Sequence, residues 1–392
     1  MRVLVMTSPV PTHLTPVVPL AWALRAAGHE VLVACQPEVE AAARRAGLCV
    51  AVVEAVDDDS SRRERAAAER AAAGPGPSPA AGGDGPPWPV LAQKWRGRTA
   101  GVLAPSTAVA RRWRPDLIVA DPLEFAAPFV AADLGVPFVH HRWGVDRFGD
   151  ERWRQARHAL SYWCAARGPG ALPEPALVLD PCPPGLQEPG LSAGGGIRFG
   201  AYNGSGSLPW RAAARGGRVC VTFGTRTVAL DGAGPLRSTL RALGGTAGPA
   251  GPGGVVVAAA AGTGALLGRV PAGVELLEDV PLNLILGRCS LVVHHGGGGT
   301  TLTAASFGLP QLVLPQAPYL VEHGERLAAC GAGEVLDRDA QETEGIRAAA
   351  ERLLSSPRVA GAARRLAAEM GAMTTAAGWV APLEEIAGRV RV

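Results

Sequence analysis

The chain has 392 residues, of which 47% are hydrophobic and 19% charged, so it has a globular composition and enough length for two domains. Its formal net charge is +3 and no long basic block occurs, which argues against nucleic acid or an anionic membrane as a partner. No apolar stretch reaches transmembrane length, the N-terminus has no signal-peptide pattern, and the seven cysteines include no CxxC pair. We therefore expect a cytoplasmic protein with reduced thiols.

The first half of the chain alternates short apolar runs with helical patterns. RVLVM (2–6) suits a buried strand, VVPLAWALRAAG (17–28) has apolar residues at helical spacing, and HEVLVAC (29–35) suits a second strand. Strand, helix and strand in this order predict parallel pairing with a right-handed crossover. The same pattern predicts helices over 38–47 and 124–135 and strands over 48–53, 115–121 and 136–143.

The second half repeats this alternation after two stretches rich in Gly and Pro, at 74–89 and 165–217. We expect strands within 217–225, 253–260, 274–280, 289–295, 310–315 and 334–337, and helices over 235–244 and 301–308. The sequence therefore predicts two doubly wound α/β domains facing each other. The expected divisions are an N-terminal domain over 1–203, a linker over 204–217, a second domain over 218–374, and a C-terminal helix over 375–392 that crosses back to the first domain.

Four consecutive glycines separate the strand ending at His295 from a helix expected to begin near Thr300. Ligands bind open parallel sheets at this edge, and a helix N-terminus offers free N–H groups to a phosphate. Glycines let those amides approach oxygen atoms closely, and His295 can add a charge-assisted hydrogen bond. The run predicts a diphosphate site, with a tight turn that binds nothing as the alternative. The chain has neither GxGxxG at this turn nor a P-loop motif.

Longer stretches resemble one enzyme family. VVHHGGGGTTLTAASFGLPQLVLPQ (292–316) resembles the donor-site signature of GT-B natural-product glycosyltransferases, and THLTPVVPLAWALRAAGHEV (12–31) looks like the start of their acceptor domain. HHRWGVD (140–146), LDPCPPGLQ (179–187) and YNGSGSLP (202–209) are similar to the actinobacterial polyketide branch. The resemblance covers nearly the whole chain and implies two facing Rossmann-like domains with doubly wound parallel sheets.

The activity that this resemblance implies is an inverting, metal-independent transfer of a deoxysugar to a natural-product aglycone. The donor would be a nucleotide sugar, usually carried on dTDP, and no other cofactor is implied. The resemblance leaves open the aglycone, the bond type, a homodimer and the need for a helper protein. It also leaves two other functions open, an accessory partner of another transferase and a nucleotide-sugar epimerase.

The resemblance assigns the donor to the second domain. Main-chain groups of Val280 would read the pyrimidine beside Leu282, and Phe223, Gly224 and Thr225 would line the phosphates. The remaining donor-site positions implied are His295, Gly296, Gly297, Gly298, Gly299, Thr300, Gln316, Tyr319 and Leu320.

Transfer of a sugar to an alcohol needs a base, and histidine titrates near neutrality. His13 lies in the loop after the first strand and matches the family's base position. Asp121 ends a strand expected in the same sheet, so we expect it to accept from the His13 ring and orient it, with a helix cap as the alternative role. His141 and Trp143 lie at the end of another expected strand and could shape the acceptor pocket, with packing as an equal alternative. Asp57 begins a run of three aspartates that we interpret as a solvated loop rather than a metal site.

One part of the family pattern is absent. The acid and glutamine that hold sugar hydroxyls are replaced by Tyr319 and Leu320 in an ungapped alignment. A donor sugar with few hydroxyls would explain this, since an unpaired polar partner costs about 1–3 kcal/mol. Two alternatives are a shifted loop that brings in Glu322 and His323, and weakened or lost transfer.

Overall fold

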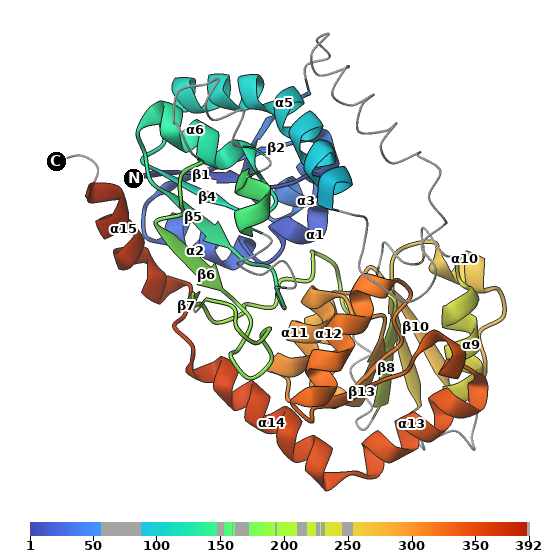
Figure 1. Ribbon diagram of the computed structural model, residues 1–392. Coiled ribbons are helices and arrows are strands. Elements are labelled where there is room, and N and C mark those ends of the chain that lie inside the picture. The colour runs from blue at the N-terminus through green and yellow to red at the C-terminus, as the bar shows by residue number, and fades with distance from the viewer. Residues whose placement is uncertain are drawn as a thin grey trace. The chain divides into compact units, whose positions relative to one another are not determined.

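The computed structural model describes residues 1–55, 88–146, 153–158, 160, 172–192, 194–209, 218–224, 228, 232–244 and 254–389 (Figure 1). The three aspartates at 57–59 and most of the loop predicted at 74–89 lie outside these residues. Contacts divide the chain into two compact units. Unit 1 comprises Met1–Pro181, Glu188–Gly200 and Thr374–Val392, and unit 2 comprises Cys182–Gln187 and Ala201–Met373. Within the described residues, no helix is long and apolar enough to cross a membrane.

Unit 1 is built on a parallel sheet with strand order β3-β2-β1-β4-β5-β6-β7. The order reverses next to β1, because β2 and β3 extend to one side and β4 to β7 to the other. The strands are β1 (Arg2–Met6), β2 (Glu30–Cys35), β3 (Cys49–Val52), β4 (Leu117–Ala120), β5 (Phe138–His141), β6 (Leu177–Asp180) and β7 (Gly195–Gly196).

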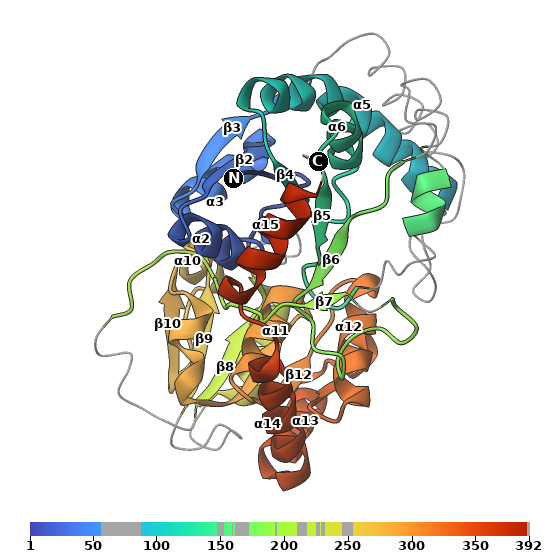
Figure 2. The same ribbon diagram turned by 90° about the vertical axis from the view of Figure 1, so that its left-hand side faces the viewer.

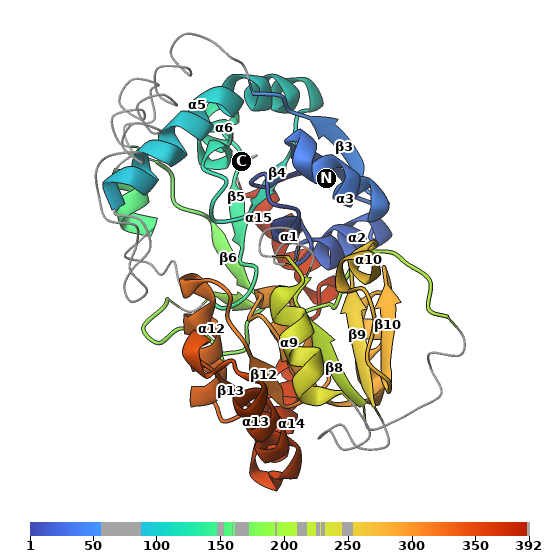
Figure 3. The ribbon, with the colours of Figure 1, turned by 90° about the vertical axis from the view of Figure 1, so that its right-hand side faces the viewer.

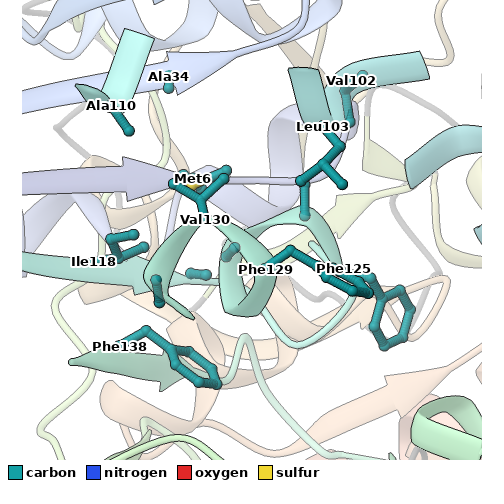
Figure 4. Close-up of a cluster of buried hydrophobic side chains, with 14 of the residues drawn as sticks. Met6, Ala34, Val102, Leu103, Ala110, Ile118, Phe125, Phe129, Val130 and Phe138 are labelled. Carbon is teal, nitrogen blue, oxygen red and sulfur yellow. The ribbon is translucent and has the colours of Figure 1, made fainter. Parts of the chain in front are cut away.

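Helices cover this sheet and complete its core. They are α1 (Pro11–Leu14), α2 (Val18–Ala26), α3 (Pro37–Arg45), α5 (Trp88–Trp113), α6 (Ala126–Leu134), the 3₁₀ helix η6 (Ala377–Trp379) and α15 (Val380–Gly388). Met6 and Ile118 from the sheet pack with Val102 and Ala110 from α5 and Val130 from α6 (Figure 4). The same core contains Leu4 beside Met6 of β1 and Ala120 beside Ile118 of β4, the alternate positions expected on one face of a sheet.

The end of the chain belongs to unit 1 rather than to the unit that precedes it. Ile197 bridges to Thr374, and the Trp379 indole donates to the Gly196 carbonyl oxygen at 3.1 Å. On α15, Glu384 lies 2.8 Å from His29, which follows α2. Figure 2 shows α15 running beside the strands of this unit. These contacts attach η6 and α15 to unit 1.

Unit 2 contains a second parallel sheet, with order β10-β9-β8-β11-β12-β13. Its strands are β8 (Arg218–Thr222), β9 (Val255–Ala259), β10 (Val274–Glu278), β11 (Cys289–His294), β12 (Gln311–Val313) and β13 (Gly333–Val335). Its α-helices are α9 (Gly234–Leu243), α10 (Thr263–Leu267), α11 (Gly298–Ser306), α12 (Pro318–Ala329), α13 (Thr343–Ser355) and α14 (Pro357–Ala372). The 3₁₀ helices are η3 (Leu282–Leu284), η4 (Leu286–Arg288) and η5 (Arg338–Ala340).

Both faces of this sheet are buried. Val219 and Val221 face one core with Leu236 and Leu240 of α9, and Figure 3 shows α9 beside β8. Cys220, between the two valines, faces the opposite core. That second core includes residues from η3, η4 and α11, namely Leu282, Leu286 and Ala304. Burial on both faces explains why these strands read as continuous apolar runs.

The structure differs from the predicted elements at several points. The helix after the glycine run begins at Gly298, two residues before the expected start. His13 lies on the short helix α1 rather than in an irregular loop. Helix α5 was not predicted, and Pro105 within it interrupts the pattern by which helices are recognised. The short strands β6 and β7 lie in the stretch rich in Gly and Pro.

Residues 182–187 are also placed differently from the expected division, because they group with unit 2. The Gly185 amide donates to Glu369 of α14 at 2.9 Å. The Arg326 guanidinium of α12 donates to the Gln187 carbonyl oxygen at 2.7 and 3.1 Å. Of the predicted linker, residues 210–217 lie outside the described residues.

Candidate active site

The predicted base lies at the carboxyl edge of the unit 1 sheet. His13 is on α1, shortly after β1, and Asp121 directly follows β4, the neighbour of β1. Trp143 lies two residues beyond β5, the next strand along. Parallel strands end at the same edge, which brings these three residues together from distant parts of the sequence.

His13 is held on one edge and one face of its ring. Its Nδ1 atom lies 2.6 Å from Ser8 Oγ and 3.6 Å from Asp121 Oδ1. The Trp143 indole stacks on the imidazole with 4.3 Å between ring centroids and 8° between planes. The predicted contact between Asp121 and the ring therefore exists as a close ion-pair distance, but Ser8 is the nearer partner.

Asp121 is fully buried, and both of its carboxylate oxygens accept hydrogen bonds from main-chain amides. Oδ2 accepts from the Ser8 amide at 2.6 Å, and Oδ1 accepts from the Leu123 amide at 2.8 Å. Burial raises the pKa of Asp121, but its interactions with His13, its hydrogen bond from Ser8 and the charge of Arg98 outweigh burial and lower the pKa to about 2. Asp121 is therefore a carboxylate at neutral pH.

A second buried carboxyl group lies close by. Glu124, 4% exposed, pairs with Arg98 of α5 at 2.7 Å and accepts from the Ala126 amide at the start of α6. Burial is the main cause that raises the pKa of Glu124, and Asp121 adds to the effect. Arg98 thus links the long helix α5 to this edge of the sheet.

Residues at the end of β5 and just beyond it divide between packing and contact with the predicted base. His141 is 1% exposed and donates from Nδ1 to the Arg142 carbonyl oxygen at 2.7 Å. Arg142 is itself buried, with Asp146 at 3.0 Å and Asp180 at 2.9 Å. Trp143 is half-buried and stacks on His13, so of the two predicted acceptor residues it is the one that contacts the base.

In unit 2, the glycine turn joins β11 to α11. Gly296 has φ +95°, and a Cβ there would lie 3.0 Å from both Leu320 O and Val313 Cγ1, so only glycine fits. The amides of Gly298, Gly299 and Thr300 lie in the first helical turn, where no preceding carbonyl of the helix accepts them. The Thr301 hydroxyl, by contrast, donates to the Gly297 carbonyl oxygen at 3.1 Å and is used within the helix.

His295 lies between two glycines of this site. A Cβ on Gly224 would lie 2.9 Å from the ring, and a Cβ on Gly297 would lie 2.6 Å from its Nε2. Among the described residues, its buried Nδ1 atom has no hydrogen-bond partner. Burial is the main cause that lowers the pKa of His295 to about 4. The imidazole is therefore neutral at pH 7 in this structure, and the predicted bond to a phosphate oxygen would be charge-assisted through the ionised phosphate.

Two more histidines support the turn from behind. His294 accepts from the Gly296 amide at Nδ1, 3.0 Å away, and donates from Nε2 to Gln311 at 2.9 Å. Burial lowers the pKa of His294 to about 3. His323 of α12 donates from Nδ1 to the Gly296 carbonyl oxygen at 2.9 Å. The main-chain N–H and C=O groups of Gly296 are thus both fixed by imidazoles.

The other predicted donor residues lie around the same sheet edge, but several are committed to the core. Phe223 is 2% exposed, so only its main chain could face a ligand. The Gln316 amide group donates to Leu314 O and Gln341 Oε1, each at 2.9 Å. Val280, Leu282 and Leu320 are buried. Thr225 and the side chain of Tyr319 lie outside the described residues.

Asn203 is a site residue that the sequence did not single out. Its amide group donates to Thr303 Oγ1 of α11 at 3.0 Å, and its oxygen accepts from the Asn283 amide of η3 at 3.0 Å. A Cβ on nearby Gly206 would collide with the Asp279 carbonyl oxygen. Asn203 therefore ties the glycine-turn helix to the segment predicted to read the base. Only its place in the quoted YNGSGSLP stretch could have suggested this.

Two further features of the described residues concern metal binding and a cavity. No group of three or more His, Cys, Asp or Glu side chains among them is arranged to hold a metal ion. A cavity of about 600 Å³ lies at the opposite, amino edge of the unit 1 sheet, beside Arg2, Arg114 and Asp116.

Comparison with known proteins identifies the family. A family model for the C-terminal domain of erythromycin biosynthesis protein CIII-like proteins matches residues 251–386, and the model for their N-terminal domain matches residues 93–224. The chain belongs to this family. L-demethylnoviosyl transferase from Streptomyces niveus is 36% identical to this chain over 94% of each chain.

Solved structures agree with this assignment. Spinosyn rhamnosyltransferase SpnG in complex with thymidine diphosphate is 36% identical and has a TM-score of 0.84, covering 98% of this chain and all of its own. The same enzyme in complex with spinosyn aglycone is 35% identical, with the same TM-score and coverage. The chain is therefore a glycosyltransferase with two Rossmann-like domains of the GT-B kind, as the sequence predicted.

Proposed function

We propose that this glycosyltransferase moves a deoxysugar from a dTDP-sugar to a natural-product aglycone, with inversion and without a metal ion. The observation that carries the proposal is the arrangement of His13, Ser8 and Asp121. A histidine held beside a buried, ionised carboxylate suits the removal of a proton from a hydroxyl nucleophile. The names of relatives support the substrate classes, since two that are each 31% identical to this chain are an aklavinone 7-beta-L-rhodosaminyltransferase and a tylactone mycaminosyltransferase.

The donor is assigned to unit 2. The amides of Gly298, Gly299 and Thr300 would hold the diphosphate, and the positive end of α11 would stabilise its charge. The buried Nδ1 atom of His295, which has no partner among the described residues, would bond a phosphate oxygen. The thymidine diphosphate complex of SpnG favours dTDP as the nucleotide.

The chemistry is a single displacement. The acceptor oxygen attacks the anomeric carbon as the bond from that carbon to the diphosphate oxygen breaks. His13 takes the acceptor proton, and Asp121 stabilises the imidazolium that forms. The diphosphate leaves with the bonding electrons while the amides of α11 neutralise its charge, so no metal is required. Attack opposite the leaving group inverts the anomeric centre.

The donor sugar is proposed to carry few hydroxyl groups. Leu320 is 5% exposed, offers no side-chain hydrogen bond, and packs its main chain against Gly296. His323, one candidate for a replacement sugar contact, is bound to the Gly296 carbonyl oxygen instead. A dideoxy or amino hexose should then turn over faster than rhamnose. Comparison of kcat/KM for dTDP-rhamnose with that for a dTDP-dideoxyhexose checks this, and a preference for rhamnose would contradict it.

The overall activity is tested by incubating the enzyme with dTDP-deoxysugars and a panel of aglycones. We expect a glycoside by mass spectrometry, with NMR couplings that show the inverted anomeric centre, and unchanged yield in excess EDTA. Binding of dTDP without transfer or hydrolysis of any sugar would contradict the proposal and would support the accessory-partner alternative.

A further inference from the structure

Ser8 lies where its hydroxyl can determine which ring nitrogen of His13 carries the hydrogen. It follows β1, is 1% exposed, and its hydroxyl oxygen lies 2.6 Å from His13 Nδ1. Its amide donates to Asp121 Oδ2 at 2.6 Å. The direct distance from His13 Nδ1 to Asp121 Oδ1, 3.6 Å, exceeds that of a good hydrogen bond. Ser8 is therefore the residue that bonds the ring, and it is itself fixed by Asp121.

The surroundings determine which ring nitrogen carries the hydrogen. The charged or titratable groups around Nδ1 are the Asp121 carboxylate and, acting on Asp121, Arg98 and His140. A negative oxygen 3.6 Å from Nδ1 favours an N–H group there over a lone pair. Ser8 Oγ has lone pairs that can accept this hydrogen at 2.6 Å. Nε2 is then left with its lone pair, as a base requires.

The stacked indole completes this restraint. Trp143 covers one face of the imidazole with only 8° between the ring planes. Tilting the imidazole about its Cβ–Cγ bond would therefore break the stack. The Ser8 hydroxyl restrains the edge of the ring and Trp143 restrains its plane. A ring held in both ways keeps Nε2 in one direction.

We propose that Ser8 is a positioning residue that accepts the Nδ1 hydrogen of His13 and thereby keeps Nε2 as the atom that takes the acceptor proton. This inference rests on the proposed function, because it assumes that His13 is the base. It differs from direct orientation by Asp121, which would need no hydroxyl at position 8.

Variants separate this role from a purely structural one. Ser8→Ala should lower kcat by about 10-fold or more, because the reactive orientation is lost, while the KM for the donor stays within about twofold. Ser8→Thr keeps the hydroxyl and should restore most of kcat. Thr7→Val is the matched control, because Thr7 Oγ1 is also buried but has no hydrogen-bond partner among the described residues. It should keep the wild-type kcat.

The tautomer can be read directly by ¹⁵N NMR of enzyme labelled at its histidines, with the His13 signals assigned by their loss in His13→Gln. When its imidazole is neutral, His13 of the wild-type enzyme should show a hydrogen on Nδ1 and none on Nε2. A protonated Nε2 in the wild type would overturn the inference even if Ser8→Ala does not fold. A folded Ser8→Ala enzyme that keeps the wild-type kcat would also overturn it.

These outcomes are distinct from failure of the proposed function. If the wild-type enzyme transfers sugar and His13→Gln does not, the base assignment stands whatever Ser8→Ala shows. If His13→Gln retains transfer, the base assignment fails, and with it the inference about Ser8.

Discussion

Asp121 combines full burial with ionisation, so its replacement should affect both stability and turnover. Its two oxygens accept from the Ser8 and Leu123 amides. In Asp121→Asn, one of these buried donors must face an NH₂ group. We expect a loss of about 1–3 kcal/mol of unfolding free energy and a fall in kcat of about 100-fold or more, because the imidazolium loses its counter-charge.

Asp133→Asn is the matched control for this variant. Asp133 pairs with Arg111 at the surface, and such exposed pairs contribute less than about 1 kcal/mol. Urea unfolding and steady-state kinetics on both variants check the prediction. Equal effects of the two substitutions would show that burial of Asp121 has no special role.

At the residue level, the sequence named several residues that the structure places close together, and their roles stay predictions. His13, Asp121 and Trp143 were named, and the structure brings them together at one sheet edge. Ser8 was missed because a serine after a strand is common in turns. Its contact with Asp121 joins residues 113 positions apart, and no local pattern reports such a pairing.

At the scale of elements, the glycine turn between β11 and α11 gives the sharpest test of the donor site. A Cβ on Gly297 would lie 2.6 Å from the His295 ring, whereas a Cβ on Gly299 would have nothing within 4 Å. Gly297→Ala must therefore displace the imidazole. We expect it to weaken dTDP binding about 10-fold or more, since the ring and the amides are proposed to bind the same diphosphate.

Gly299→Ala serves as the structural control for the same turn. An alanine in a helix without steric conflict should leave stability unchanged or raise it by up to about 1 kcal/mol. Thermal unfolding and isothermal titration with dTDP measure both effects. A Gly297→Ala enzyme with wild-type dTDP affinity would remove His295 and its glycine neighbours from the donor site.

The sequence predicted the elements of both sheets better than it predicted how they are supported. The strand, glycine and helix order around 289–308 marked the turn, because glycines and apolar periodicity are local signals. His294, His323 and Asn203 fix this turn through contacts that span up to 100 residues. Their chemistry is not visible in any short stretch, so the support of the turn could not be predicted.

At the scale of the whole molecule, buried neutral histidines make stability depend on pH. Burial lowers the pKa of His140, His141 and His295 to about 4 and that of His294 to about 3. An unfolded histidine titrates near 6.5, so between pH 6.5 and these lower values the unfolded chain binds protons that the folded chain does not. Stability should therefore fall as pH falls through this window.

His140→Phe isolates one of these protons. His140 packs edge-on against Phe138 and Trp153, and its Nε2 has no hydrogen-bond partner among the described residues. An apolar ring of similar shape should keep or raise the unfolding free energy at pH 7. Between pH 6 and 4.5, the variant's unfolding free energy should fall less steeply than that of the wild type, by about 1.4 kcal/mol per pH unit. Urea unfolding across this range measures the slope. An unchanged slope would mean that His140 is protonated in the folded protein.

The architecture of the molecule followed from the alternation of strands and helices, which the order of both sheets matches. The assignment of segments to units did not follow as simply. Residues 182–187 group with unit 2 through Gly185 and Gln187, whose contacts are main-chain bonds to distant side chains. Main-chain groups are the same at every position, so their choice of partner leaves no trace in the sequence.

The most direct test of the whole account compares turnover with donor binding in His13→Ala. Because the proposed base belongs to unit 1 and the proposed diphosphate site to unit 2, the substitution should lower kcat by about 100-fold or more while the Kd for dTDP stays within about twofold of the wild type. Steady-state transfer assays and calorimetric titration with dTDP give the two numbers on the same preparation. Retained turnover, or an equal loss of turnover and dTDP affinity, would contradict the account.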